Sequence, residues 1–516
     1  MQEFDVSIQE QLYIGMCDAY PSHLLPKGSF QLIRNGLVDN NKIFKRGGAT
    51  SLFTAVGSLL PNGGFGYEKS NGTKEIIVNF NGASNARLYK WTGSGTATAI
   101  GSANLTNDTP MNFCQASDSL FGFNGVEVVD YDGTTVTKDR SGVPKGTFGV
   151  YFHNYLFVSG VSGNPDRVYF SNLGTPTTFT AADYVDINAN DGDAVTGFGI
   201  LNDELIIFKK YSIWSISGFS GATFGATTIA GQNTQLKAGG IGTPSHRSIV
   251  AIGRDLYYLS FNGNTPHFRS LNQTVFAKTI ERGVISWEIE GTMDGLNKAQ
   301  LSKATGIYDG RYVHWAVPNG ASTTNDLILS VNPTSSYKTT LGTFKPWSIH
   351  SGANISQFFV STISGQSRIY GTSATANGKA YLFNDTSSYA DDGTAVTLTI
   401  RTRDFLPDPA RKTKYIYMYH KYLTGSAGTL TVNARAEKAA DFGLQESVSL
   451  AGNSPGLGSF ILGTSVLGGA DLNTNRVTFA HLTGHTIGVE FIEATANSCE
   501  LYDMQILGLK KGYRNS

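Results

Sequence analysis

The segment NFCQASDSLFGFNGVEVVDYDGTTVTK, residues 112–138, decides the fold class of this chain. Short runs in which apolar and polar residues alternate are separated by an Asn-Gly pair at 124–125 and an Asp-Gly pair at 132–133. These pairs are typical of tight turns between antiparallel strands, because the central residues of such turns need positive φ. The segment therefore predicts a unit of consecutive antiparallel strands.

The same pattern recurs along the chain at a spacing of about 35 to 50 residues, while helical periodicity is almost absent. Such a unit cannot bury both faces alone, but copies packed radially can. We therefore predict an all-β protein with a β-propeller of six to eight blades at residues 61–394. A set of β-sandwiches, which would show similar strands without a repeat in length, is the alternative. The further units lie at residues 74–91, 147–172, 195–218, 248–271, 304–349 and 357–384.

Two flanking regions do not fit the repeat. Residues 1–60 contain polar, strand-like sequence, and we expect an extended N-terminal segment that contacts neighbouring molecules. Residues 395–516 open with a basic stretch at 401–414 and continue with long alternating strands around a Gly-rich span at 452–469. About five or six strands in this length are typical of a compact β-sandwich, which we expect as a C-terminal domain.

Composition excludes several classes of protein. The chain has 516 residues with 60 Gly, and 40 Lys plus Arg balance 40 Asp plus Glu. No strong net field therefore draws it to nucleic acid or to an anionic membrane. Cys17, Cys114 and Cys499 lie far apart, which predicts free thiols in a reducing cytoplasm. We see no secretory signal and no apolar stretch long enough for a membrane helix, so we expect no membrane span.

Catalytic and metal-binding motifs are not found. The oxygen-rich turn at residues 186–193 resembles the start of a calcium loop, but it lacks the Gly and Glu that an EF-hand needs at fixed positions. His481 and His485 flank a turn, where their spacing does not place both rings on one face. We expect no cofactor, no metal and no enzymatic activity.

A carbohydrate-binding or glycan-hydrolysing propeller is the alternative function. Hydrolysis would need two suitably placed carboxylates in a central cleft, and exposed tryptophans could stack on sugars. Trp214 and Trp315 instead have apolar neighbours two residues away, which favours core packing. An adhesin is a third hypothesis, which the missing export signal disfavours.

Local positive charge marks candidate contact residues. In a ring-shaped assembly, several copies of such clusters could form a cationic belt around a lumen; solvated turns are the alternative. The notable clusters are Lys209 with Lys210, and Arg401, Arg403, Arg411 and Lys412.

Several segments together resemble the nozzle proteins of short-tailed bacteriophages, also called tail tubular B or packaged-DNA stabilisation proteins. The opening is similar, with Arg34-Asn35 followed by Lys45-Arg46-Gly47-Gly48 just before the first repeat unit. The order and spacing of the later segments are similar as well. They are DRVYFSNLGTPTTF at 166–179, residues 190–218, GTPSHRSIV at 242–250, RYVHWAVP at 311–318, LILSVN at 327–332 and RIYGTSATANGKAYLFN at 368–384.

The resemblance implies a structural virion protein, located in the tail and made in the host cytoplasm. It implies a ring, expected to be a hexamer, that extends the portal and adaptor channel, retains packaged DNA and conducts it during ejection. The expected partners are further copies of the chain, adaptor or portal proteins, tail fibres or spikes, and double-stranded DNA that passes without sequence recognition. Arg34, Lys45 and Arg46 join the candidate lumen or interface contacts.

Overall fold

The structure is a computed structural model that describes residues 4–39, 41–218, 234–276, 283–424, 428–437, 441–450 and 473–511. Strands form most of the secondary structure of these residues, and the helices are short. The all-β prediction is therefore confirmed. The helical elements used below are α2 (Leu271–Phe276), α3 (Glu290–Asp294), η2 (His246–Ser248), η4 (Trp287–Ile289) and η5 (Lys298–Lys303).

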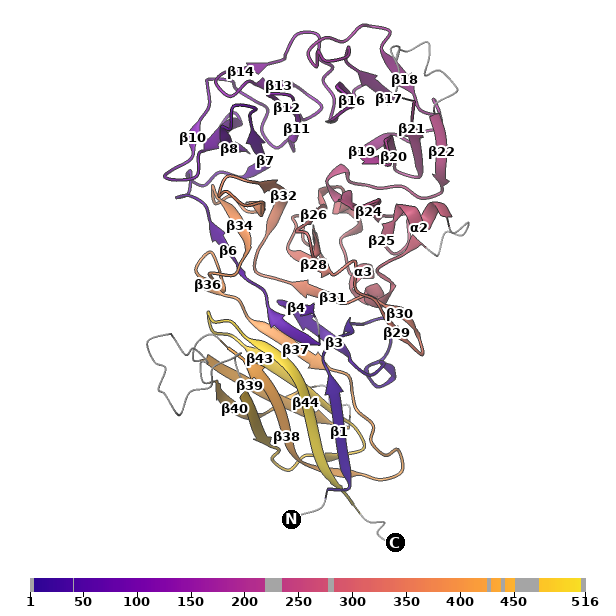
Figure 1. Cartoon of the computed structure of the whole chain (residues 1–516), viewed down its shortest axis with the longest axis vertical. Coiled ribbons are helices and arrows are strands. Elements are labelled where there is room, and N and C mark those ends of the chain that lie inside the picture. Colours follow the sequence, from indigo (N-terminus) through magenta and orange to yellow (C-terminus); the bar gives the residue numbers. More distant parts are fainter. Residues whose placement is uncertain are drawn as a thin grey trace.

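In the described part of the chain, six separate antiparallel sheets lie around a ring (Figure 1). The first two are β7 (Pro61–Glu68), β8 (Lys74–Phe80), β9 (Arg87–Trp91), β10 (Thr98–Ala99), and β11 (Asn112–Ala116), β12 (Ser119–Phe123), β13 (Val128–Tyr131), β14 (Val136–Lys138). The next two are β15 (Phe148–Phe152), β16 (Tyr155–Val161), β17 (Asn164–Phe170), β18 (Tyr184–Asp186), and β19 (Val195–Leu201), β20 (Glu204–Lys209), β21 (Ser212–Ile216), β22 (Thr234–Gly239).

The fifth sheet contains β23 (Val250–Ile252), β24 (Asp255–Ser260) and β25 (His267–Ser270), and the last contains β32 (Ile355–Ser361), β33 (Arg368–Ser373), β34 (Ala380–Asp385) and β6 (Gly48–Ser51). Between these two sheets, the ring is completed by β26 (Thr305–Tyr308), β27 (Val313–Val317), β28 (Leu327–Val331) and β31 (Trp347–His350), which form one end of a ten-stranded sheet. The predicted propeller is confirmed, within the expected range of blades.

The turns that the sequence predicted form the corners of the blades. Gly125 and Gly133 adopt φ of 82° and 92°, a region that side chains rarely enter, so the Asn-Gly and Asp-Gly pairs can reverse the chain. Central strands such as β28 are buried along their whole length, because neighbouring blades cover both faces. Trp315 and Trp347 are fully buried and stack on Phe268, with ring centroids 4.0 and 5.8 Å away.

The ring is closed by a strand from the start of the chain. β6 pairs antiparallel with β34, so that Thr50 lies opposite Leu382 and the last blade joins residues more than 300 positions apart. Figure 1 shows β6 beside β34 at the edge of the ring. The lower boundary of the propeller at residue 61 was therefore wrong, because residues 48–51 belong to it.

The C-terminal sandwich is built from both ends of the chain. One sheet contains β4 (Gly36–Asp39), β5 (Lys42–Lys45), β44 (Glu500–Lys510), β38 (Thr413–Leu423) and β41 (Asn473–Thr478), with β1 (Val6–Gln11) on β44 and β42 (Thr483–Gly484) on β38. The other contains β3 (Ser29–Arg34), β37 (Leu398–Thr402), β43 (Ile487–Glu493), β39 (Gly428–Ala436) and β40 (Gly443–Leu450), with β2 (Gly15–Met16) on β3.

The sequence analysis predicted residues 1–60 as a separate extended segment, and this prediction was wrong. Their described strands pair with the sandwich and with the last blade, because the unpaired edges of β44, β37 and β34 need hydrogen-bonding partners. A contact between this segment and neighbouring molecules remains a prediction.

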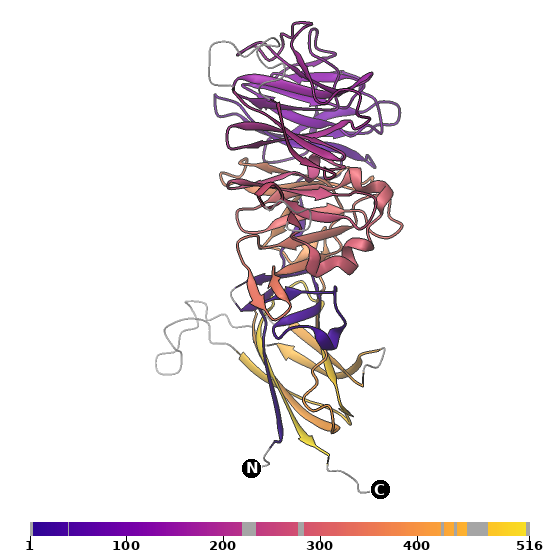
Figure 2. The same cartoon turned by 90° about the vertical axis from the view of Figure 1, so that its right-hand side faces the viewer.

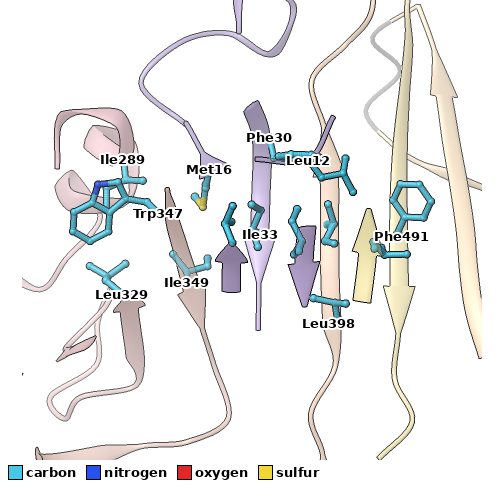
Figure 3. Packing of buried hydrophobic residues seen from close by; sticks show 14 of the residues in the cluster. Leu12, Met16, Phe30, Ile33, Ile289, Leu329, Trp347, Ile349, Leu398 and Phe491 are labelled. Carbon is cyan, nitrogen blue, oxygen red and sulfur yellow. The ribbon is translucent and has the colours of Figure 1, made fainter. Parts of the chain in front are cut away.

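The propeller and the sandwich share one sheet and one core. β3 pairs with β31 of the propeller on one side and with β37 of the sandwich on the other. Ile33, Ile349 and Leu398 line up across this junction in a single hydrophobic cluster that reaches Trp347 at one end and Phe491 at the other (Figure 3). Viewed from the side, the sandwich extends from the edge of the propeller and carries both termini at its far end (Figure 2).

The sandwich core contains a histidine that should make its stability depend on pH. His420 is 2% exposed, and neither ring nitrogen has a hydrogen-bond partner among the described residues. Burial lowers the pKa of His420 to about 4. The unfolded chain takes up this proton below about pH 6.5, whereas the folded chain does so only near pH 4. Only the unfolded chain binds this proton between about pH 6.5 and pH 4. The contribution of the neutral His420 to folding stability is therefore fully present at neutral pH and is lost as the pH falls through this range.

We expect the His420→Phe variant to lose about 2 kcal/mol less stability than the wild type when the pH falls from about 7 to about 5. Urea unfolding followed by fluorescence at both values measures the difference. His23→Phe, at a half-buried surface position, is the control and should keep the wild-type pH dependence. Identical pH dependence in wild type and His420→Phe would show that His420 is not the cause of the loss of stability at low pH.

Candidate functional site

Three of the candidate contact residues are buried ion-pair partners within the chain. Lys45, at the end of β5, is 2% exposed, and its Nζ donates to Glu493 Oε2 at 2.6 Å and to the Thr495 carbonyl. Arg46 is 1% exposed and holds both carboxylate oxygens of Asp391, while its Nε donates to Asn35 Oδ1 at 3.1 Å. Lys45 and Arg46 therefore cannot line a lumen or an interface, and that prediction was wrong for both.

Lys209 is the third buried cation, and it explains the oxygen-rich turn. Its Nζ lies 2.7 and 2.8 Å from the carboxylate oxygens of Asp191 and donates to the Ile187 carbonyl at 2.9 Å. The Asp166 carboxylate is 3.3 Å away. The cation that these oxygens surround is thus the lysine ammonium group. The prediction of Lys209 as a surface contact was wrong, because its side chain is fully buried.

The remaining candidates lie nearer the surface and do not form one cluster. Lys210 is exposed on the propeller, with its Nζ 5.0 Å from the Tyr211 ring centroid, and Arg411 is exposed on the sandwich. Three more make ion pairs with acids: Arg401 with Glu490 at 2.6 Å, Arg403 with Glu10 at 3.1 Å and Lys412 with Glu437 at 3.3 Å.

Arg34 and Arg401 are the candidates that the structure brings together. They stand on the adjacent strands β3 and β37 and line one open cleft of 790 Å³ beside the junction of propeller and sandwich. Arg435 lines the same cleft, packs over the Phe442 ring at 4.5 Å and pairs with Asp404. Three acids, Asp18, Asp441 and Glu490, balance the three arginines of this lining. The cleft is therefore polar but carries no net charge.

A second cavity, of 610 Å³, lies on the axis of the propeller. Its lining comes from segments all around the ring, from Pro61 on β7 to Ser356 on β32. Such a cavity is the usual size of a ligand site. Sequence analysis missed it, because its lining comes from all around the ring. One segment of the sequence could have indicated this cavity: GTPSHRSIV at 242–250 contains His246 and Arg247, which lie at the axis.

Arg247 crosses the axis and ties opposite blades together. It stands on η2, before the fifth sheet, and its Nε donates to Asn112 Oδ1 at 2.7 Å. Its Nη2 donates to the carbonyls of Met111 at 2.8 Å and Asn62 at 3.2 Å, at the start of the first two blades. The side chain therefore obstructs the axial opening of the propeller.

His246 lies beside Arg247 as a neutral ring. Its Nδ1 accepts a hydrogen bond from the Phe198 backbone N–H at 3.2 Å, and it stacks on Phe148 with centroids 5.0 Å apart. Burial, followed by the nearby Arg247 charge, lowers the pKa of His246 to about 4. Because Nδ1 is an acceptor, the ring proton is on Nε2 at neutral pH.

The serine and the histidine of a Ser–His–Asp arrangement elsewhere in the propeller are buried. His314 Nδ1 lies 2.6 Å from Ser330 Oγ and its Nε2 lies 3.2 Å from Asp309 Oδ2, while His350 Nε2 reaches the same hydroxyl at 2.7 Å. Ser330 and His314 are 0% and 1% exposed. The hydroxyl cannot meet a substrate in this arrangement, so the network serves to satisfy buried polar groups.

The tryptophans named in the sequence analysis and the three cysteines are also buried or half-buried. Trp91, Trp315 and Trp347 are core residues, which confirms the core-packing interpretation of Trp315, and Trp214 is half-buried against another core cluster. Cys17, Cys114 and Cys499 are buried free thiols, as predicted, and burial raises the pKa of each to about 12.

The fold and its axial cavity define a β-propeller protein with a composite sandwich. No protein-family model and no curated protein sequence matches the chain. Among the described residues, we find no helix with the length and apolar character needed to cross a membrane.

Solved structures with similar folds are propellers of different kinds. The C-terminal WD40 domain of Sif2 is 11% identical, with 74% of this chain and 97% of that chain covered and a TM-score of 0.35. The Neurospora crassa Pan2 WD40 domain is 7% identical, with 68% and 97% covered and a TM-score of 0.38. An exo-β-1,3-galactanase from Phanerochaete chrysosporium is 10% identical, with 79% and 97% covered and a TM-score of 0.24. These values carry no argument about function.

Proposed function

We propose that the chain is a structural protein of a bacteriophage tail, a nozzle or hub that assembles as a ring, expected to be a hexamer. The ring extends the portal and adaptor channel, retains packaged DNA and conducts it during ejection. The observation that carries the proposal is the ten-stranded sheet, which joins the propeller to the sandwich without a flexible linker. A channel wall needs subunits of fixed shape, and a shared sheet and core supply that stiffness.

The segments behind the resemblance have structural roles that suit such a subunit. Lys45-Arg46-Gly47-Gly48 forms the joint where the chain leaves β5 of the sandwich and enters β6 of the propeller. GTPSHRSIV carries Arg247, which ties opposite blades. Both segments fix the shape of the subunit.

The channel would lie between subunits. Since Arg247 crosses the axis of the propeller and hydrogen-bonds to the first two blades, a DNA duplex cannot pass through that opening. The exposed candidates Arg34, Lys210, Arg401, Arg411 and Lys412, and the half-buried Arg403, remain the residues that we propose for lumen or subunit contacts.

The test is the protein composition of purified phage particles. We expect peptides of this chain in gradient-purified virions, at a copy number far below that of the coat protein, and their loss from tail-less capsids. Particles that contain none of this chain, although it is expressed during infection, would refute the tail role.

The hydrolytic form of the alternative function receives no support from the axial cavity. Glycoside hydrolysis needs a pair of carboxyl groups, and Asp108 alone supplies one among the described residues that line the cavity. Ligand binding without hydrolysis is a separate question, taken up below.

A further inference from the structure

The axial cavity contains a cation that the protein does not neutralise. All three acceptors of the Arg247 guanidinium group are neutral: the Asn112 amide oxygen and the carbonyls of Met111 and Asn62. No carboxylate of the described residues makes an ion pair with it, in contrast to Arg46, which holds Asp391. The remaining nitrogen, Nη1, makes no hydrogen bond within the described chain. The Nη1 group of Arg247 can therefore donate hydrogen bonds to one charged acceptor.

The partial burial of Arg247 would strengthen its interaction with an anion. Arg247 is a partly buried residue of the cavity lining, and desolvation, which disfavours the charged form, lowers its pKa to about 10. A buried charge is destabilising when it is left unpaired, and a charge-assisted hydrogen bond in such a place is strong. Binding of an anion would thus offset the cost of burying this charge.

His246 offers a neutral hydrogen bond in the same cavity. It lines the cavity with an Nε2–H donor that has no partner among the described residues. Asn325 also lines it, but this residue is 2% exposed and its Oδ1 is enclosed within the described structure, so a ligand in the cavity does not reach that oxygen. The Nε2–H of His246 is therefore the group placed to donate a hydrogen bond to a hydroxyl of a ligand.

We propose that the axial cavity binds a small, hydroxyl-bearing anion, a sugar acid or a sugar phosphate, with its anionic group on Arg247 and a hydroxyl on the Nε2–H of His246. The volume of 610 Å³ accommodates a ligand of this size. The rim carries one exposed cation, Lys303, and one exposed anion, Asp108, so selection for negative charge rests on Arg247. This inference does not depend on the tail role.

The test is isothermal titration calorimetry of the full chain with galacturonate, glucose 6-phosphate, inorganic phosphate and neutral galactose. Arg247→Gln removes the charge but also a tie between blades, so its folding is checked by thermal unfolding. Ser302→Trp provides the second variant, because Ser302 is an exposed residue of the lining, where a bulky side chain blocks entry and leaves Arg247 in place. Lys210→Gln, on the outside of the propeller, is the matched control.

We expect millimolar or tighter binding of galacturonate or glucose 6-phosphate, weakened at least about tenfold by Arg247→Gln and by Ser302→Trp and unchanged by Lys210→Gln. Which of the two ligands binds distinguishes a carboxylate from a phosphate. Absence of binding by both, equal binding of galactose, or affinity that neither axial variant changes would overturn the proposal. Inorganic phosphate that binds as tightly as the sugar phosphate would overturn the role of the hydroxyl group and of His246.

Discussion

Replacement of Gly48 by valine is expected to prevent closure of the propeller and to destabilise the protein by more than about 3 kcal/mol. Gly48 opens β6, the strand that completes the last blade. A Cβ atom at this position would lie 2.0 Å from the Ala390 carbonyl oxygen and 2.6 Å from its carbon. Because the obstacle is backbone, it cannot rotate away, and the strand must leave its partner β34. Urea unfolding and limited proteolysis measure the effect.

The control for this substitution is Gly239→Val. Gly239 also lies in a strand, β22, but no atom lies within 4 Å of its added Cβ. We expect this variant to keep nearly wild-type stability. If Gly48→Val unfolds at the same urea concentration as the wild type and resists protease equally, β6 does not close the ring.

Replacement of Lys45 by methionine should cost about 3–5 kcal/mol of folding stability. The Lys45 and Glu493 side chains are 0% and 1% exposed, so the variant leaves a carboxylate buried without its cation. The pair joins β5, near the start of the chain, to β43, near its end, and its loss should loosen the sandwich around the joint. Chemical denaturation of the purified variant gives the value.

The double variant Lys45→Met/Glu493→Gln separates an unpaired charge from lost packing. If the unpaired charge is the cause, the double variant should recover a large part of the lost stability, because a neutral amide is cheaper to bury. Lys210→Met, at an exposed position, should change stability by less than about 0.5 kcal/mol. A Lys45→Met loss as small as that of Lys210→Met would show that the pair is not needed.

Local sequence predicted the blades because their hairpins are local. The Asn-Gly and Asp-Gly corners and the alternating strands at 112–138 contain the information that forms β11 to β14. The same reasoning failed for residues 1–60, whose strands find partners hundreds of residues away on β34, β37 and β44. No local pattern in the sequence reveals such pairing. Residues 1–60 were therefore predicted as an extended segment outside the two domains.

The prediction that basic residues form lumen or interface contacts failed in part for a related reason. A cluster of basic residues normally indicates a solvated surface, but Lys45, Arg46 and Lys209 are buried, because acids from other parts of the chain neutralise them. Asp391 lies 345 positions from Arg46, and Glu493 lies 448 from Lys45. The axial cavity was hidden in the same way, since the segments that line it come together only when the ring closes.

The most direct test of the proposed assembly is electron microscopy of phage particles that carry a tagged copy of this chain, labelled with gold against the tag. We predict gold at the tail vertex and, in end-on averages of released tails, a closed ring whose central opening lies between propellers. Gold on capsid faces alone, or single unassembled subunits with no ring in any preparation, would contradict this account.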